Sequence, residues 1–520
     1  MKVFWQKCKD VAASAVALAI FMLVSYAEIY FFVSGGFFST NRLLYGYSFL
    51  SILLIALMSG STIYFGINLY FSLYRPEIER KGALLFALEL LTIVIGVVIP
   101  VMIYYVRTFE AATLLVTLPY FLAVLAALLF LFLIPLVRRN KLFAILAVVV
   151  MIGAVCGFGA VSANGEKVAF EADPVVLDNG ESFSVVWCTN VASVGYLEYS
   201  YQGQTYTIYD EEGGRYVADR RVHSVRVPYD HLYGNTYTVS AAKVLRNASR
   251  FSKVGSFLTS KGYRFADKVT GGELKMLSLT DWHEKNDRLY AAAKDRDFDL
   301  LLLMGDAINY VNEFDDILNY VVIPGGKLTG GVKPAIFVRG NHEVRGPYAE
   351  EIRSALGLNE YYFTATYGEV NFLVMDGADD KADDDPQNGI LTVCEAYRER
   401  ELAEMEAVFL PASGYNICLC HIPFYSMGKE AESAPPLHAT EQYDRFRALL
   451  EKHKVKLEIS GHDHSLYFGE EKGIDLLIAG GPTEDQGYVS CMITVKAGVA
   501  TIEAYNNEGT VATYGPIALS

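Results

Sequence analysis

The chain has 520 residues, of which 52% are hydrophobic, and a net charge of −15. This length is too great for one domain core and predicts about three domains at ~150 residues each. The charge is uneven, because residues 1–162 hold 11 Lys and Arg against 6 Asp and Glu, whereas the rest holds 33 against 53. An acidic remainder argues against nucleic-acid binding, since phosphate backbones need cationic partners. The seven cysteines show no CxxC spacing, which argues against a zinc ribbon or thioredoxin-like motif.

Residues 1–162 are expected to form a helical transmembrane bundle. A bilayer crossing takes about 20 apolar residues, and five stretches reach this length, at roughly 11–33, 47–74, 83–106, 111–137 and 142–162. Nine Lys and Arg flank the spans on one side, against only Arg42 and Arg107 on the other. The positive-inside rule then places the N-terminus in the cytoplasm. Five crossings put residues 163–520 outside it, so the sequence predicts a multi-pass protein of the cell membrane.

Two features of this region leave alternatives open. The fifth span ends in Ala-Val-Ser-Ala at residues 160–163, which resembles a signal-peptidase site, so release of the remainder after Ala163 is one alternative. Glu28 and Glu89 lie within spans, where ionisable side chains are costly, and each is a candidate for a transport or sensing role. The region contains no internal repeat and no cluster of ionisable groups typical of a transporter.

Residues 165–260 are expected to form a small β-sandwich. Short β-branched or alternating runs are separated by turn signals such as Asp178-Asn179-Gly180, and about seven strands fit the segment. Trp187 and Tyr237 are the expected large core residues. The runs at 223–227 and 234–239 resemble a fibronectin-type-III-like module, in particular the one that precedes the catalytic domain of purple acid phosphatases. This part would act as a spacer or as a wall of the active-site cleft.

From residue 272 to about 510, apolar strands alternate with helical stretches, which indicates an α/β domain. Five of these strands end just before short polar motifs. The motifs are Asp281-Trp282-His283, Gly305-Asp306, Gly340-Asn341-His342-Glu343, His421 and Gly461-His462-Asp463-His464. Open α/β sheets place their sites at the carboxyl ends of strands, where loops converge. The five motifs are therefore expected to form one site.

Carboxylate and imidazole groups suit ions such as Fe, Mn and Zn, and the glycines before them allow sharp turns. Five of the nine histidines fall in these motifs, whereas His223, His231, His438 and His453 lack such a context and are expected to be structural or on the surface. Each motif alone is weak, because a lone histidine after a strand is usually an ordinary loop residue. The order of five motifs within about 185 residues is what indicates a two-metal site.

This ordered set resembles the calcineurin-like metallophosphoesterase superfamily over residues 272–510, which implies an αββα sandwich. The resemblance implies that Asp281, His283 and His464 bind one metal, that Asn341, His421 and His462 bind the other, and that Asp306 bridges both. It also implies that His342 protonates or stabilises the leaving group. Purple acid phosphatases carry a tyrosine three residues after the bridging Asp, where this chain has Asn309. A tyrosinate-ligated Fe(III) centre is therefore not expected, nor is the Asp that phosphoprotein phosphatases place there.

The predicted function is a membrane-anchored, outward-facing hydrolase that uses two Mn, Fe or Zn ions. It would cleave a phosphate mono- or diester of a small molecule or an envelope component by in-line attack of a hydroxide that bridges the metals. Arg345 could reach a phosphate oxygen or be a solvated surface residue. The acidic run 379–385 is expected to be a solvated loop, with an extra cation site as the alternative. Two rivals are a transporter or sensor whose outer domain binds a phospho-ligand without turnover, and a structural envelope protein.

Overall fold

The computed structural model describes residues 167–247, 252–411, 413–424, 440–471 and 473–519. The five predicted membrane spans, with Glu28 and Glu89, lie outside these residues. Within them, no helix combines the length and the apolar character that a bilayer crossing requires. The chain divides into two units, and the following description concerns the larger one, Lys167–Val244 with Val254–Ser520.

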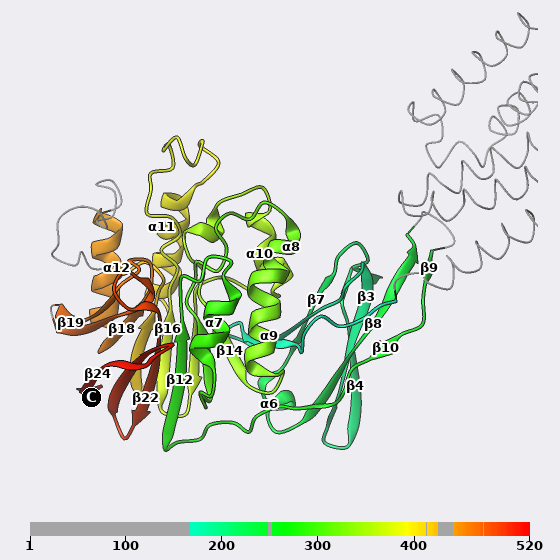
Figure 1. Cartoon of the computed structure of the whole chain (residues 1–520), viewed down its shortest axis with the longest axis horizontal. Helices are drawn as coiled ribbons and strands as arrows, with labels where there is room; N and C mark the ends of the chain where they lie inside the picture. The colour runs from blue at the N-terminus through cyan, green and yellow to red at the C-terminus, as the bar shows by residue number, and fades with distance from the viewer. Residues whose placement is uncertain (1–166, 248–251, 412, 425–439, 472, 520) are drawn as a thin grey trace, which may run out of the picture. The chain divides into compact units, whose positions relative to one another are not determined.

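One large sheet runs through this unit (Figure 1). Its central strands β12 (Glu273–Leu279), β13 (Leu300–Leu303) and β14 (Pro334–Phe337) are parallel, and all but the first residues of β12 are buried. Strands buried on both faces read as nearly continuous apolar runs, as Leu300–Leu303 does. Beyond β12 the sheet continues antiparallel through β22 (Gly487–Lys496), β23 (Val499–Asn506) and β24 (Gly509–Ala518), with the short β21 (Gly481–Thr483) paired to β22.

A second sheet faces the first. It has the order β15 (Phe363–Tyr367), β16 (Val370–Val374), β17 (Tyr415–Leu419), β18 (Leu457–Ser460), β20 (Ile474–Ala479) and β19 (Leu466–Glu471). The four strands from β16 to β20 in this order are parallel. Apolar side chains from both sheets, such as Met276 and Leu302 from one and Phe372 and Ile417 from the other, form one buried cluster. The two sheets therefore share a core.

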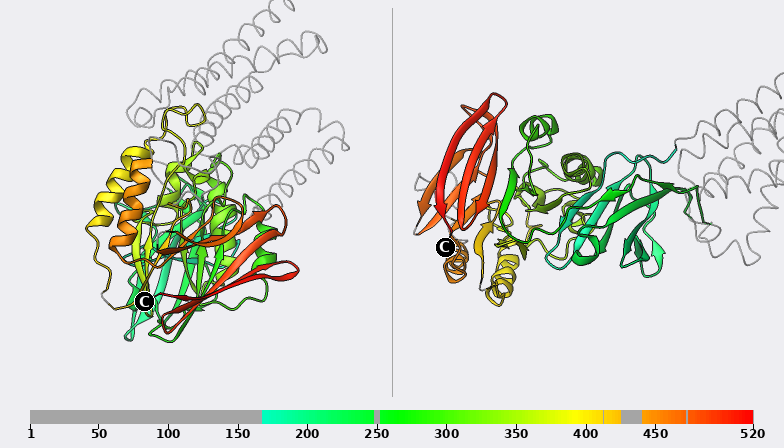
Figure 2. Two further views of the ribbon diagram at one scale, coloured as in Figure 1. Left: turned by 90° about the vertical axis from the view of Figure 1, so that its left-hand side faces the viewer. Right: turned by 90° about the horizontal axis from the view of Figure 1, so that it is seen from below.

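Helices cover the outer faces of the two sheets. One face is covered by α7 (Asn286–Ala293), α8 (Phe314–Ile317), a π-helical turn (Leu318–Val322), α9 (Ile323–Thr329) and α10 (Ile352–Ala355). The other is covered by α11 (Cys394–Glu406) and α12 (Thr440–Lys452), which lie side by side (Figure 2). This is the αββα arrangement that the sequence predicts for the third domain.

The strands expected in the preceding segment are present. They include β1 (Val175–Asp178), β2 (Phe183–Cys188), β3 (Ser193–Tyr201), β4 (Gln204–Tyr209), β7 (Val222–Val227) and β8 (Thr236–Arg246), with shorter strands at Glu211–Glu212, Arg215–Tyr216, Lys253–Val254, Leu258–Thr259 and Tyr263–Arg264 and a helical turn at Tyr229–Leu232. The strands β1, β2 and β7 lie in one sheet, and β3, β4 and β8 lie in a second sheet. Trp187 and Tyr237 are buried in the core between them, as predicted.

The connection between this segment and the α/β part differs from the sequence prediction. Strand β1 pairs in parallel with β14, so β1, β2 and β7 extend the large sheet. Side-chain hydrogen bonds reinforce this joint: the Tyr367 hydroxyl donates to Asp178 Oδ2 at 2.8 Å, and the Tyr237 hydroxyl donates to the Gly331 carbonyl at 2.7 Å. A separate fibronectin-type-III-like module is not confirmed. Without β1, β14 would be an edge strand with unpaired N–H and C=O groups, and pairing with β1 satisfies them.

Candidate metal centre

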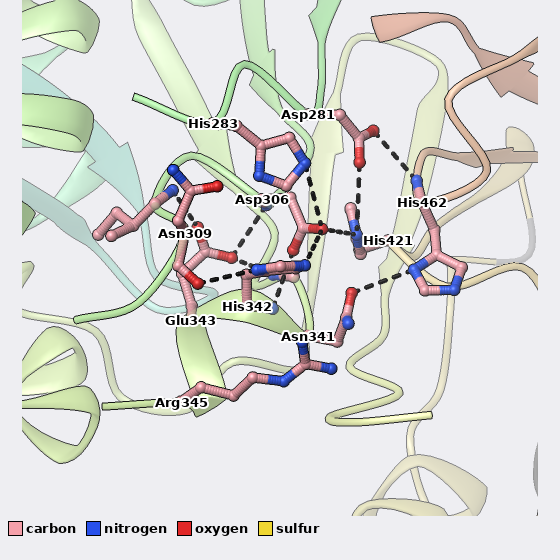
Figure 3. A network of polar contacts seen from close by, with 12 residues as sticks. Asp281, His283, Asp306, Asn309, Asn341, His342, Glu343, Arg345, His421 and His462 are labelled. Carbon is pink, nitrogen blue, oxygen red and sulfur yellow. Dashed lines mark hydrogen bonds and ion pairs between the residues drawn. The ribbon is translucent and has the colours of Figure 1, made fainter. Parts of the chain in front are cut away.

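The five polar motifs meet at one edge of the two facing sheets. Strands β12, β13 and β14 of the first sheet end at the motifs that contain Asp281, Asp306 and Asn341, and strands β17 and β18 of the second end at those with His421 and His462. Because the strands within each set are parallel, their carboxyl ends share one edge. Figure 3 shows the side chains converging on Asp306.

The loops that carry these residues have an uncommon backbone. The φ angle is positive at Asp281 (54°), His283 (42°), Asp306 (52°), His462 (71°) and His464 (48°). Non-glycine residues adopt this region seldom, and strained positions of this kind concentrate at functional sites. Gly305, also at positive φ, lies so near that a Cβ atom would stand 2.7 Å from His421 Nδ1. The glycine expected to permit the turn is thus also required by the close approach of a ligand candidate.

The first group of ligand atoms comes from Asp281, His283 and His464. The Nε2 atoms of the two histidines lie 3.0 Å apart, and His464 Nε2 lies 3.3 Å from Asp281 Oδ1. Asp281 Oδ2 accepts hydrogen bonds from Thr280 Oγ1 (2.6 Å) and the His462 N–H (3.1 Å), while the buried Oδ1 has no hydrogen-bond partner. One carboxylate oxygen is therefore anchored and the other is left free for a cation.

The second group comes from Asp306, His421 and His462. The His421 Nδ1–H donates to the Met304 carbonyl at 2.6 Å, because a carbonyl can only accept. This bond orients the ring so that Nε2 points at Asp306 Oδ2, 3.3 Å away, and this buried Nε2 has no hydrogen-bond partner. Asn341 Oδ1 lies 3.1 Å from His462 Nδ1 and completes the set. These residues fit a bound metal, because oriented, unpaired imidazole and carboxylate atoms are what such a site requires.

Asp306 belongs to the second group, also approaches His283 of the first, and dominates the electrostatics of the site. Its Oδ2 lies 4.0 Å from His283 Nε2 and 3.8 Å from His342 Nε2. Burial opposes its ionisation, but the neighbouring histidines, His421 above all, lower the pKa of Asp306. Burial likewise opposes a charged His421, yet Asp306 and Asp281 raise the pKa of His421 to about 10. A metal ion would take the place of that proton, so metal uptake releases a proton.

His342, the predicted acid, is 24% exposed, and its ring forms a third possible ligand group with His283 and Asp306. Its Nδ1–H donates to the backbone carbonyl of Asn309 at 2.8 Å, so the other ring nitrogen, Nε2, faces the site. Position 309 therefore holds His342, but it does so through the main chain. A tyrosine ligand is absent at this position, as the sequence states.

Glu343 is a functional residue that sequence reasoning quoted within a motif but did not assign. Its buried carboxylate accepts four backbone N–H groups: Gly340 (2.8 Å) and Asp306 (2.9 Å) at Oε2, and Ala307 (2.6 Å) and Ile308 (3.1 Å) at Oε1. Glu343 thus fastens the loop after β13 to the loop after β14. The signal that could have found it is its place directly after Asn341-His342.

The acidic run 379–385 is not a solvated loop throughout, and that prediction is wrong for its first two residues. Asp379 is fully buried and pairs with Arg345 at 2.8 Å, and Asp380 lies 3.6 Å from Arg345 and 3.7 Å from His462 Nε2. Arg345 is only 8% exposed, so it is not a solvated surface residue either. The loop therefore places the negative charge of Asp380 next to His462, a predicted metal ligand.

The described histidines outside the motifs have structural surroundings. His223 is buried between Ser193 Oγ (2.7 Å) and Asp210 Oδ2 (2.7 Å), and His231 Nδ1 lies 2.8 Å from the Tyr199 hydroxyl. His453 Nε2 bonds to the Met405 carbonyl at 3.3 Å. The order Ser–His–Asp resembles that of a hydrolytic triad, but Ser193 is fully buried and no substrate could reach it. His438 lies outside the described residues.

Comparison with known proteins supports the same domain assignment. Residues 274–466 match the family model described as calcineurin-like phosphoesterase, which spans all five motifs. No curated protein matches the chain. Among solved structures, the GAP50 anchor in the inner membrane complex of Plasmodium is 15% identical, with a TM-score of 0.34 over 48% of this chain and 90% of that one.

Two further solved structures have similar scores. PhoD is 13% identical, with a TM-score of 0.38 over 67% of this chain and 92% of that one. The phosphopantetheinyl hydrolase of Mycobacterium tuberculosis is 15% identical, with a TM-score of 0.28 over 40% and 89%. Scores of this size are general likenesses, whereas the family match covers the whole candidate site. Residues 274–466 therefore constitute a calcineurin-like phosphoesterase domain.

Proposed function

We propose that this chain is a metal-dependent phosphoesterase that hydrolyses a phosphate mono- or diester. The observation that carries the proposal is the set of adjoining ligand groups, one formed by Asp281, His283 and His464 and another by Asp306, His421 and His462, with Asp306 also grouped with His283 and His342. In this proposal Asp281, His283 and His464 hold one ion. Asn341, His421 and His462 hold the other, and Asp306 contributes to both. The ions would be Mn, Fe or Zn, as the mixture of carboxylate, amide and imidazole donors favours.

When bound, the ions supply positive charge to the phosphate oxygens and acidify the attacking water. The side chains of the protein supply the proton for the leaving oxygen. His342 directs Nε2 into the site, and its fixed Nδ1–H bond to the Asn309 carbonyl allows Nε2 to carry a proton for the leaving oxygen. Asn309 supplies no phenolate, so the centre is proposed as a metallophosphoesterase without tyrosinate ligation.

The proposal extends to the membrane. Five apolar stretches in residues 1–162 and the nine-to-two distribution of basic residues support a multi-pass anchor with residues 163–520 outside the cytoplasm. A cysteine at the exposed Asp384 tests the orientation, because the five described cysteines are buried and give little background. An impermeant maleimide should label Asp384→Cys in intact cells. Labelling only after permeabilisation would reverse the proposed orientation.

Activity is tested on the full chain in lipid nanodiscs with Mn, Fe or Zn added back. Hydrolysis of a generic aryl phosphate is expected, together with about two bound ions per chain if both groups fill. His342→Ala should retain its metals and lose roughly 10²–10⁴-fold in turnover, whereas His453→Ala, which is remote from the site, serves as the control. Bound metal without turnover on mono- or diesters would favour the sensor or transporter. Unchanged turnover in His342→Ala would rule out the role proposed for it.

A further inference from the structure

A cavity of about 990 Å³ adjoins the candidate metal centre. Tyr310 and Arg345 line it, and the ring of Tyr310 lies 6.0 Å from that of His342. From there the cavity runs between the segment after His342 and the segment that leads into α11. That second segment projects at the top of Figure 1. The cavity therefore begins on the side of the centre where the proposed acid stands, and its size matches that of small-molecule sites.

The rim of this cavity is apolar and exposed. Leu391 and Val393 line it and are 91% and 69% exposed, and the neighbouring Ile390 is 76% exposed. Tyr310, which also lines the cavity, is 45% exposed, so three of the twelve exposed large apolar residues of the described chain line it and Ile390 adjoins them. Exposed apolar patches mark binding sites. Ile390 also has a φ of 62°, a strained conformation for a β-branched side chain and typical of ligand clamps.

The cations of the cavity are already engaged within the protein. Three of its four arginines pair with carboxylates, and the fourth lies over an aromatic ring. The contacts are Arg339–Asp376 at 2.6 Å, Arg345–Asp379 at 2.8 Å, Arg353–Glu360 at 2.8 Å and Arg400 over Tyr397 at 5.2 Å. Arg339 also stacks on Tyr361 at 4.0 Å. The three arginines that are already paired with carboxylates offer little attraction to a polyanion, which disfavours a nucleotide with several phosphates in this cavity.

We propose that this cavity binds the organic group of the substrate and that this group is an apolar chain, as in the phosphate ester of a long-chain alcohol. The inference rests on the proposed function, because the phosphate would lie at the metal centre. The ester oxygen would then face His342. The alkyl chain of the substrate would pass Tyr310 and cover Leu391 and Val393.

The test measures kcat/KM for ethyl, butyl, hexyl and octyl phosphate below their micelle concentrations, with the full chain in nanodiscs. A fully buried methylene strengthens binding about fourfold and a half-buried one about twofold, so six further methylenes should raise kcat/KM roughly 60-fold. Leu391→Ser with Val393→Ser should lose most of this gradient. Phe409→Ser is the matched control, because Phe409 is 96% exposed and does not line the cavity.

The outcomes separate this inference from the proposed function. Turnover of ethyl phosphate with a flat series overturns the cavity assignment alone. If kcat/KM still rises with alkyl length in the double variant, the cavity assignment is also overturned, because the alkyl chain of the substrate would then be partitioning into the lipid of the nanodisc. A nucleoside monophosphate with a higher kcat/KM than octyl phosphate contradicts the substrate class. If no ester turns over, the proposed function fails, and calorimetry of octyl against ethyl phosphonate still tests the cavity: equal affinities would overturn it.

Discussion

Glu343→Gln tests the hydrogen bonds that join two of the motif loops. Each oxygen of the Glu343 carboxylate accepts two backbone N–H groups, at 2.6–3.1 Å. A glutamine amide keeps one acceptor oxygen and places an NH₂ group against the other pair, so two buried N–H donors lose their partner. Each buried donor without an acceptor costs about 1–3 kcal/mol. We therefore expect unfolding free energy to fall by about 2–6 kcal/mol, although the two side chains have nearly the same volume.

The assay is urea unfolding of the full chain in nanodiscs, followed by the fluorescence of the buried tryptophans Trp187 and Trp282. Metal content should fall in parallel, because three of the four N–H groups that Glu343 accepts belong to Asp306 and the two residues that follow it. Glu350→Gln, an exposed change of the same chemistry seven residues further along the chain, should alter unfolding free energy by less than about 0.5 kcal/mol. A loss below about 1 kcal/mol in Glu343→Gln, with full metal content, would refute this account of the loops.

Three further predictions concern the surroundings of the centre. Asp380→Asn removes the carboxylate 3.7 Å behind the His462 ring and should weaken metal binding by about 10–100-fold in calorimetry; an equal loss in the exposed control Asp384→Asn would contradict this. Burial raises the pKa of Glu458 to about 7 from 4.5, so the folded state retains this proton. The stabilisation is complete below about pH 4.5 and is lost as pH rises through 7. Glu458→Gln should therefore gain about 3 kcal/mol relative to the wild type at pH 8, and an unchanged pH profile of unfolding would exclude this titration. In Gly461→Ala the new Cβ would stand 2.8 Å from Asp281 Oδ2, so metal content should fall by at least half, and normal content would show that the loop can yield.

Much of the site could be predicted from short stretches of sequence. A buried strand followed by glycine and a polar residue is a local pattern, and parallel strands bring such ends to a common edge. The seven predicted ligands and His342 therefore lie together. Side-chain chemistry is legible in a sequence, whereas the role of Asn309 was not, because the atom that holds His342 is a backbone carbonyl that every residue has.

Other features depend on contacts that no local pattern specifies. The run Asp-Asp-Lys-Ala-Asp-Asp-Asp at 379–385 has the composition of a solvated loop, yet Arg345, 34 residues away along the chain, draws Asp379 into the interior. A buried ion pair of this kind forms only where packing brings the partners together. The pairing of β1 with β14 is a similar case, because an edge strand accepts any suitable partner that the chain can deliver.

The sequence by itself determined the α/β class of residues 272–510, the identity of the candidate ligands and the strand ends that carry them, because these follow from hydrophobic periodicity and side-chain chemistry. Only the tertiary structure decided that Glu343 fastens two loops, that Asp380 lies behind His462, and that an apolar-rimmed cavity opens beside His342. Those features arise from groups tens of residues apart whose proximity is set by how the loops pack above the two sheets. The metal-binding residue types are thus a local property of this chain, and the surroundings that select a substrate are a property of its fold.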